Sequence, residues 1–246
     1  MNFFGTLERL KGPLFELMDV FVANSANRQA EVIECVISFF AVAVIVFVVF
    51  PLREVARGYV AKLIGDDTGE REGRLTLNPF SHIDPRGAFF LCITCIGWSR
   101  TMPINYNRCT KVKPRTAVIL TSLAGPVASI LLSYITMIIS KLLFVTADFN
   151  SVSFEMMYYI SMGLSQITLI NVSLAVLHLL PIPPFDGSKI LCCFLPPKGV
   201  IFMERYGQII NLIFFVALIL GFLDVPLAYL DVGLIMLLDA ASFFVG

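Results

Sequence analysis

The sequence predicts an all-α polytopic membrane protein, a helical bundle with a small β element and a re-entrant segment after its first span. Hydrophobic residues make up 57% of the 246 positions and charged residues 15%, whereas soluble domains contain roughly 45–50% and 25%. Five long runs carry few or no charges, and basic residues gather between them. A chain of this size could not hide so much apolar surface from water, so the bilayer must be part of its solvent.

Residues 1–31 are predicted to form an amphipathic segment that lies in the membrane interface. Charges of both signs occur throughout this stretch, so a cleaved signal peptide is not expected. The remaining residues, 32–246, are predicted to form one membrane domain. The apolar positions of the first segment recur at helical spacing: Leu7, Leu10, Leu14, Leu17, Met18 and Phe21.

Five apolar runs of sufficient length for a span follow in order. They cover residues 36–52, 116–140, 156–185, 206–223 and 225–246. The fifth run is unusual because it holds acidic residues. Asp224, Asp231 and Asp239 share one helix face, where they would either line a polar seam or lie at the membrane interface.

The stretch between the first two runs contains the predicted β element and the re-entrant segment. Residues 74–77 alternate between polar and apolar side chains as a strand does. Residues 87–98 are apolar but too short to span as a helix, which favours a re-entrant segment or a membrane-edge strand. His82 is expected to brace the turn between these two elements.

The basic residues predict the orientation of the chain. Net charge is zero, so no general electrostatic attraction to nucleic acid is expected. Fourteen of the 18 lysines and arginines lie in residues 53–86, 99–115 and 183–205, which share one side if residues 87–98 enter and leave on that side. The positive-inside rule places this side in the cytoplasm of a cell (plasma) membrane.

Two short motifs place ionisable residues at the ends of hydrophobic runs. The first is R-E-V-A-R at residues 53–57, and the second ends in L-L-P-I-P-P-F-D-G at residues 179–187, directly after His178. Ionisable groups near hydrocarbon are costly, so they suggest a function. Three prolines within four residues also end the helix just before Asp186.

The order of these and other motifs over roughly residues 34–245 resembles the site-2 protease family of intramembrane zinc metalloproteases, in the compact prokaryotic form without a PDZ domain. The resemblance rests on G-Y at 58–59, G-D-D-T at 65–68, G-R-L-T-L-N-P at 73–79, H-I-D-P-R-G at 82–87, P-I-N at 103–105, A-G-P at 124–126 and the proline motif at 179–187.

The resemblance implies a zinc site that this sequence does not complete. In the family, two histidines of H-E-x-x-H and the aspartate of D-G hold zinc, and the glutamate activates water. Here the histidine positions are Arg53 and Arg57, while the base position Glu54 and the ligand Asp186 remain. Arginine has no free lone pair for a metal, so no metal cofactor is expected. The family's substrate-positioning asparagine corresponds to His178.

Two pairs of interpretations follow for the altered residues. Arg53 and Arg57 either pair with Glu54 and Asp186 as a substitute for the zinc charge, or extend to the nearby membrane interface. His178 is either a neutral hydrogen-bonded histidine or part of a residual metal site.

The sequence therefore predicts a catalytically inactive pseudoprotease that binds or regulates membrane-protein partners through their transmembrane segments. An active intramembrane zinc metalloendopeptidase is the alternative, and a transporter that uses the buried charges as a relay is the second alternative. The lipid bilayer is the expected environment, and no nucleic-acid partner is expected.

Overall fold

The computed structural model describes residues 13–14, 17, 20, 28–94, 97–146 and 153–243, and within these ranges the secondary structure is entirely helical. The prediction of an amphipathic segment over residues 1–31 falls largely outside them. The elements are α3 (Arg28–Val44), the π-helical turn η1 (Ile45–Val49), α4 (Phe50–Leu63), α5 (Thr68–Arg71), η2 (Pro79–Ser81), α6 (Pro85–Thr94), η3 (Tyr106–Arg108), α7 (Pro114–Thr146), α8 (Ser153–Leu179), α9 (Asp186–Phe194), α10 (Pro197–Ile219) and α11 (Asp224–Ala241).

Four helices in the described ranges are long and apolar enough to cross a bilayer, and the chain is a multi-pass membrane protein. They are Glu31–Leu63, Pro114–Val145, Met156–Leu179 and Pro197–Leu218. These helices confirm the first four predicted runs, although the third ends at Leu179, before the prolines that follow.

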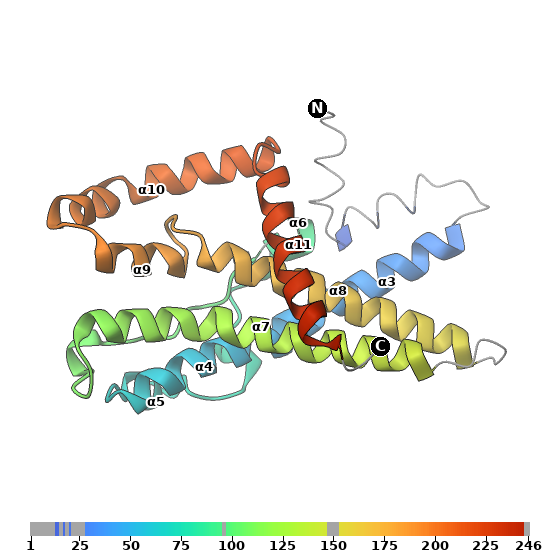
Figure 1. Cartoon of the computed structure of the whole chain (residues 1–246), viewed down its shortest axis with the longest axis horizontal. Coiled ribbons are helices and arrows are strands. Elements are labelled where there is room, and N and C mark those ends of the chain that lie inside the picture. The colour runs from blue at the N-terminus through green and yellow to red at the C-terminus, as the bar shows by residue number, and fades with distance from the viewer. Residues whose placement is uncertain are drawn as a thin grey trace.

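The fifth predicted run forms α11, which is not one of these four candidate spans. Figure 1 shows α11 lying across α7 and α8 rather than alongside them. Asp231 of α11 accepts a hydrogen bond from Ser173 of α8 at 2.7 Å, and Asp239 pairs with Lys141 of α7 at 2.6 Å. These two aspartates therefore form a polar seam that fixes α11 to the bundle.

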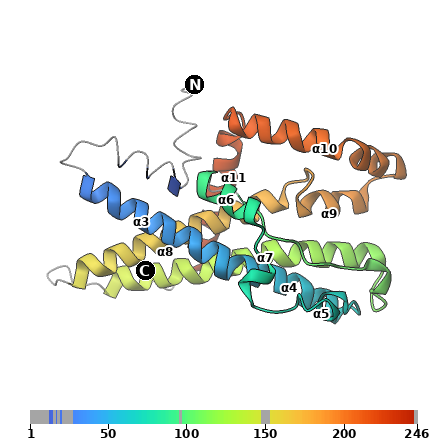
Figure 2. The same ribbon diagram turned by 180° about the vertical axis from the view of Figure 1, so that it is seen from behind.

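The first span is continuous from α3 through η1 to α4 (Figure 2), and its last part, α4, carries Arg53, Glu54 and Arg57. Pro51 is the second residue of α4, two positions after η1 ends at Val49. Proline cannot donate a backbone hydrogen bond and would crowd the carbonyl four residues earlier. The π-helical turn just before it is a common way to accommodate such a disruption within a helix.

The helices α7 and α8 lie side by side through a seam of small polar residues (Figure 1). Thr136 and Thr168 hydroxyls are 2.7 Å apart, and those of Ser140 and Ser161 are 2.8 Å apart. Asn171 donates to the backbone carbonyl of Ser129 at 3.1 Å. Small side chains allow close approach of helices in a membrane, and hydroxyl groups bond across it. This pairing provides the frame that holds the site.

The predicted β element is wrong, because residues 74–77 form bends without strand pairing. Hydrogen bonds from side chains hold this stretch, where a strand would be held by backbone hydrogen bonds to a partner strand. Arg74 Nη2 donates to the Arg100 carbonyl at 3.0 Å, and His82 Nε2 lies 2.7 Å from the Thr76 carbonyl. His82 is fully buried, which agrees with its expected role as a brace. The alternating polar and apolar side chains at residues 74–77 therefore belong to a loop that packs against neighbouring loop segments, and not to a strand.

Residues 87–98 begin with the short helix α6 rather than a strand, and the chain then returns to its starting point. A Cβ atom on Gly87 would collide with the carbonyl of Trp98, and Trp98 Nε1 donates to Asp84 at 3.1 Å. The Arg100 amide donates to the His82 carbonyl at 2.8 Å. The two ends of residues 87–98 therefore lie side by side.

Candidate functional site

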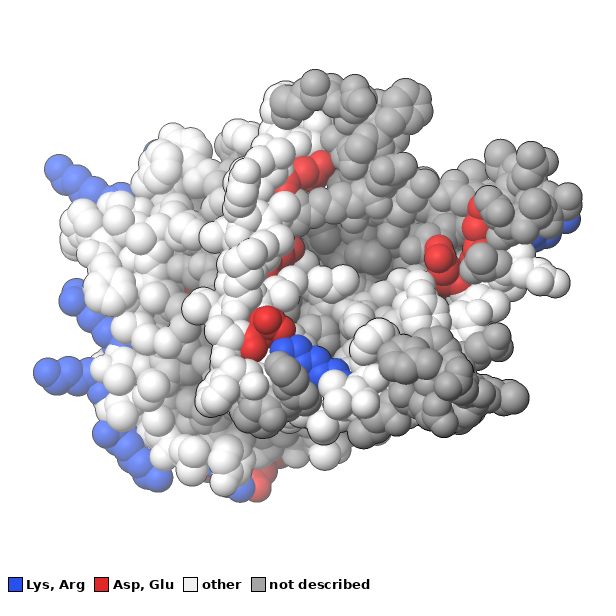
Figure 3. All heavy atoms as spheres, turned by 45° about the vertical axis from the view of Figure 1, so that its right-hand side comes forward, with Lys and Arg blue, Asp and Glu red and all other residues white. Residues whose placement is uncertain are grey.

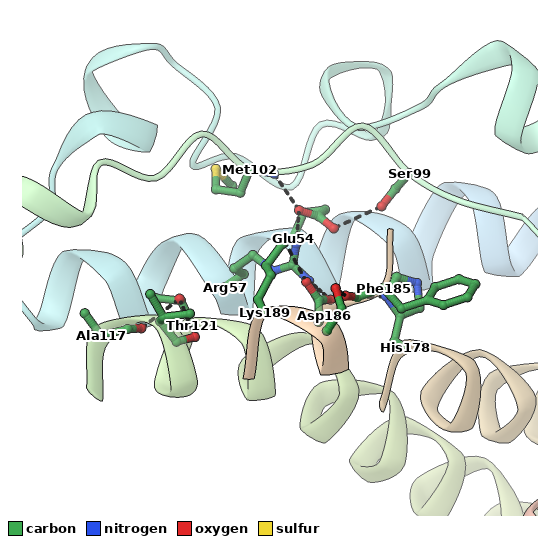
Figure 4. A network of polar contacts seen from close by, with 12 residues as sticks. Glu54, Arg57, Ser99, Met102, Ala117, Thr121, His178, Phe185, Asp186 and Lys189 are labelled. Atoms are coloured by element: carbon green, nitrogen blue, oxygen red, sulfur yellow. Dashed lines mark hydrogen bonds and ion pairs between the residues drawn. The ribbon is translucent and has the colours of Figure 1, made fainter. Parts of the chain in front are cut away.

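Four of the five residues singled out in the sequence, Glu54, Arg57, His178 and Asp186, meet at one place in the bundle (Figure 4). The fifth, Arg53, lies within electrostatic range of Glu54, Arg57 and Asp186. Arg53, Glu54 and Arg57 lie on α4, His178 near the end of α8, and Asp186 at the start of α9. We call Arg53, Glu54, Arg57 and Asp186 the buried charge cluster, because each residue keeps 4% or less of its surface exposed.

Arg57 is the central contact of the buried charge cluster. Its Nη2 donates to Oδ2 of Asp186, and its Nη1 lies 3.8 Å from Oε2 of Glu54. Gly125 of the A-G-P motif leaves room for this guanidinium, since an added Cβ would lie 3.1 Å from Nη2. One arginine therefore faces both family carboxylates.

Asp186 has partners on both carboxylate oxygens. His178 Nδ1 lies 3.1 Å from Oδ2, and Lys189 Nζ donates to Oδ1 at 3.0 Å. Burial alone would raise the pKa of the Asp186 carboxyl, but the His178 hydrogen bond and the charges of Arg57 and Lys189 outweigh it and hold that pKa well below its usual value. Asp186 is thus an ionised acceptor saturated by three donors.

Glu54 is held by residues of the loop after α6. Ser99 Oγ donates to Oε1 at 3.0 Å, and the Met102 amide donates to Oε2 at 2.6 Å. The Met102 side chain in turn packs against α4, where a Cβ on Gly58 would lie 2.8 Å from its terminal carbon. Glu54 therefore fastens residues 99–102 to α4.

Arg53 differs from Arg57 although both are buried. It has no hydrogen bond or ion pair with any described residue of the chain. With 4% of its surface exposed, it does not extend to the membrane interface either. Of the two guanidiniums expected to pair with carboxylates, the structure pairs one.

The proline motif sets the position of Asp186. Pro181, Pro183 and Pro184 prevent α8 from continuing, and α9 begins at Asp186. Gly187 then allows the start of α9 to pack directly on the end of α8, because a Cβ there would collide with the Leu179 and Leu180 carbonyls. This close packing brings Asp186 to His178.

The residues at the site do not fit a zinc ion. Catalytic zinc needs three protein ligands with free lone pairs. No group of three or more His, Cys, Asp or Glu side chains suited to a metal occurs in the described ranges. The one retained ligand, Asp186, already accepts from Arg57, His178 and Lys189.

A cleft of about 500 Å³ opens beside the site, between the start of α7, α9 and α10. Most of its lining is apolar, including Val118, Pro183 and Met203, and Lys189 lies on its wall. Because Lys189 also contacts Asp186, the cleft leads to the edge of the buried charge cluster.

Sequence reasoning missed four contributors to the site. Lys189 could have been found, because it lies three positions after Asp186 at a helix start, where side chains share a face. Ser99 and Met102 gave no local signal, and Gly125 was noted only as part of the A-G-P motif. Their roles depend on contacts with residues more than 40 positions away.

Comparison with known proteins gives two matches. The family profile described as "Peptidase family M50" matches residues 37–222. The chain is also similar to the Bacillus subtilis (strain 168) protein named "Putative zinc metalloprotease YwhC", with 39% identity over 174 residues, which cover 68% of this chain and 76% of that relative. No solved structure matches the chain at a significant level.

Proposed function

The chain belongs to peptidase family M50, the site-2 protease family, and from this premise we propose that it is a non-catalytic member that binds and regulates membrane-protein partners. The observation that carries the proposal is the Arg57–Asp186 contact. It places a guanidinium on the carboxylate that the family uses as a zinc ligand.

The charges of the site give a physical reason for this replacement. Without a divalent cation, Glu54 and Asp186 would be buried anions that lack compensation, which is costly. Arginine stays protonated and its planar fork suits carboxylates. Glu54 also accepts two hydrogen bonds from residues 99–102, which leaves fewer lone pairs free to activate a water molecule.

The partner that suits this site is a transmembrane segment of another membrane protein. The cleft beside Lys189 is lined mainly by apolar side chains, and two of the helices that line it, α7 and α10, are long enough to cross the bilayer. An apolar segment could enter such a cleft without exposing its backbone to lipid.

Metal analysis of the purified protein tests the proposal. After gentle detergent extraction, the wild-type protein should contain no stoichiometric zinc. A variant with Arg53→His and Arg57→His restores H-E-x-x-H and serves as the matched control, which should gain zinc. Near one zinc per wild-type chain, lost on Asp186→Ala, would contradict the proposal.

An active intramembrane zinc metalloendopeptidase is the second candidate. It is favoured by the name of the Bacillus subtilis relative and by the retention of Glu54 and Asp186. A transmembrane reporter that is cleaved in proteoliposomes and protected by a zinc chelator would support this candidate, whereas we expect no cleavage with or without chelator.

We also propose that the basic loops and the site face the cytoplasm from a plasma membrane. Figure 3 shows Lys and Arg side chains gathered at the end of the molecule that Figure 1 assigns to α5 and the α9–α10 connection. Single cysteines at Asn107 and Asn150 in a cysteine-free background should label from opposite sides, with Asn107 reached from the cytoplasm. Labelling of both from one side would contradict this orientation.

A further inference from the structure

The cleft between α7, α9 and α10 lies where the hydrocarbon of a bilayer meets the lipid headgroups. Arg115 of α7 directly precedes the uncharged run 116–140, and Glu204 of α10 lies two positions before the run 206–223. Both residues line the cleft. Runs of this length occupy the hydrocarbon layer, so charged residues that directly precede them lie at the headgroup level.

The cleft presents one cation and one anion that the protein does not pair. Its charged lining consists of Arg115, Lys189 and Glu204. Lys189 is already engaged, since its Nζ lies 3.0 Å from Oδ1 of Asp186. The side chains of Arg115 and Glu204 are exposed, and neither forms a hydrogen bond or ion pair with a described residue.

These two charges belong to opposite walls of the cleft. Figures 1 and 2 show α9 between α7 and α10. On the α7 side, Cys193 Sγ of α9 donates to the Arg115 carbonyl at 3.8 Å. On the α10 side, burial and the charge of Glu204 raise the pKa of the Cys192 thiol. Apolar side chains, among them Val118, line the space between the two walls.

We propose that this cleft binds a zwitterionic phospholipid with a primary amine in its headgroup, as in phosphatidylethanolamine. Arg115 binds the phosphate, because a guanidinium fork matches phosphate oxygens. Glu204 accepts hydrogen bonds from the ammonium, and the apolar lining contacts part of an acyl chain. The inference goes beyond the proposed function: the lipid occupies the cleft when no partner segment does, and its binding requires no partner.

The charges of the lining favour this headgroup over two common alternatives. An anionic phosphatidylglycerol offers Arg115 a phosphate but leaves Glu204 without a cation. The quaternary ammonium of phosphatidylcholine has the right charge but no hydrogen to donate to the carboxylate. The cleft volume of about 500 Å³ lies within the range of pockets that hold small molecules, roughly 300–1,000 Å³.

Native mass spectrometry of the intact protein in detergent tests the inference. Phosphatidylethanolamine, phosphatidylglycerol and phosphatidylcholine with identical acyl chains are added in equal amounts, and the bound fraction of each is measured. Phosphatidylethanolamine should exceed each of the others by about threefold, as expected of a partly exposed ion pair.

Variants locate this preference. Glu204→Gln should bind phosphatidylethanolamine and phosphatidylglycerol equally, whereas Arg115→Gln should weaken the binding of all three lipids, because each carries a phosphate. Glu72→Gln and Arg86→Gln are the matched controls. Both residues are exposed and lie outside the lining of the cleft, so their removal should leave the preference intact.

The other outcomes overturn the inference. Equal binding of the three lipids to wild-type protein removes the headgroup preference on which it depends. A preference for phosphatidylglycerol assigns lipid binding to the basic residues alone. A preference for phosphatidylethanolamine that survives Glu204→Gln places its site outside this cleft. None of these results changes the outcome of the zinc measurement, so failure here is distinguishable from failure of the proposed function.

Discussion

The buried charge cluster and the charges just beyond α4 use the same kind of ion pair in different surroundings. In the buried charge cluster, the side chains of Arg57 and Asp186 are 5% and 3% exposed. We call Asp67, Arg71 and Arg108 the loop charge cluster, and their side chains are 39%, 63% and 43% exposed. Asp67 lies 2.7 Å from Arg71 and 3.1 Å from Arg108, so both clusters contain direct ion pairs.

Solvation decides what each cluster does. Water can replace a lost partner in the loop charge cluster, so each of its ion pairs is worth little. It cannot do so around Asp186, where loss of a partner leaves an uncompensated buried charge. The stability of the protein therefore depends on the buried charge cluster, and such a cluster is stable only if its positive and negative charges balance.

The largest expected effect is that of separating Arg57 from Asp186. Arg57→Leu or Asp186→Leu alone should destabilise the protein by about 3–5 kcal/mol, because either leaves buried charge unpaired. The double variant should recover much of the loss, since it removes opposite charges together. Thermal unfolding in detergent measures all members of the cycle.

The control is the same cycle in the loop charge cluster, with Asp67→Leu and Arg71→Leu. Its effects should be small and additive, as expected of exposed pairs. Additive losses for Arg57 and Asp186 would remove the distinction between the two clusters and would mean that the guanidinium does not substitute for the metal charge.

The second effect concerns the space around Arg57. A Cβ on Gly125 would lie 3.1 Å from Arg57 Nη2, so Gly125→Ala should displace the guanidinium and cost about 1–3 kcal/mol. The matched control is Gly233→Ala on α11, where nothing lies within 4 Å of an added Cβ. Thermal unfolding should show a loss at Gly125 that is absent at Gly233, and equal effects at both would contradict the packing argument.

Much of this arrangement was predictable from sequence, and the reasons for the exceptions are physical. The four candidate spans could be predicted from uninterrupted hydrophobic runs. A run that crosses lipid must form its backbone hydrogen bonds within itself, as a helix does. Glu54, Arg57 and Asp186 could be placed at one site because each belongs to a recognisable motif. The resemblance could not say which carboxylate each arginine meets, since that depends on side-chain geometry between helices.

The loop after the first span shows why the β element was mispredicted. The alternation at residues 74–77 is short, and a strand needs a partner that the sequence does not identify. Instead, Arg74 and His82 bond backbone carbonyls of the adjoining loop segments. Side-chain hydrogen bonds thus take the role that backbone hydrogen bonds have in a sheet. The spacing of polar and apolar residues in the sequence does not reveal such bonds.

The third effect separates the two arginines within the buried charge cluster. Arg53→Leu removes a cation that makes no hydrogen bond or ion pair with a described residue, although Glu54 and Asp186 attract it, so the loss of stability should be small, about 0–2 kcal/mol. Arg57→Leu in the same detergent is the contrast and should be strongly destabilising. An equal loss for both would mean that Arg53 is also tied to a carboxylate.

The smallest effect is expected in the loop charge cluster, where pH can be used to isolate it. Burial raises the pKa of Asp67, but the hydrogen bond and charge of Arg71 and the charge of Arg108 together outweigh it and lower that pKa below its usual value. A carboxyl whose pKa is lower in the folded state contributes stability above its unfolded pKa, and the contribution is lost as pH falls through the folded pKa. Asp67→Asn should therefore unfold marginally earlier than wild type near neutral pH, and the difference should vanish in acid and in high salt. A large difference that persists in high salt would show that Asp67 is shielded from water, and the contrast with Asp186 would no longer rest on solvation.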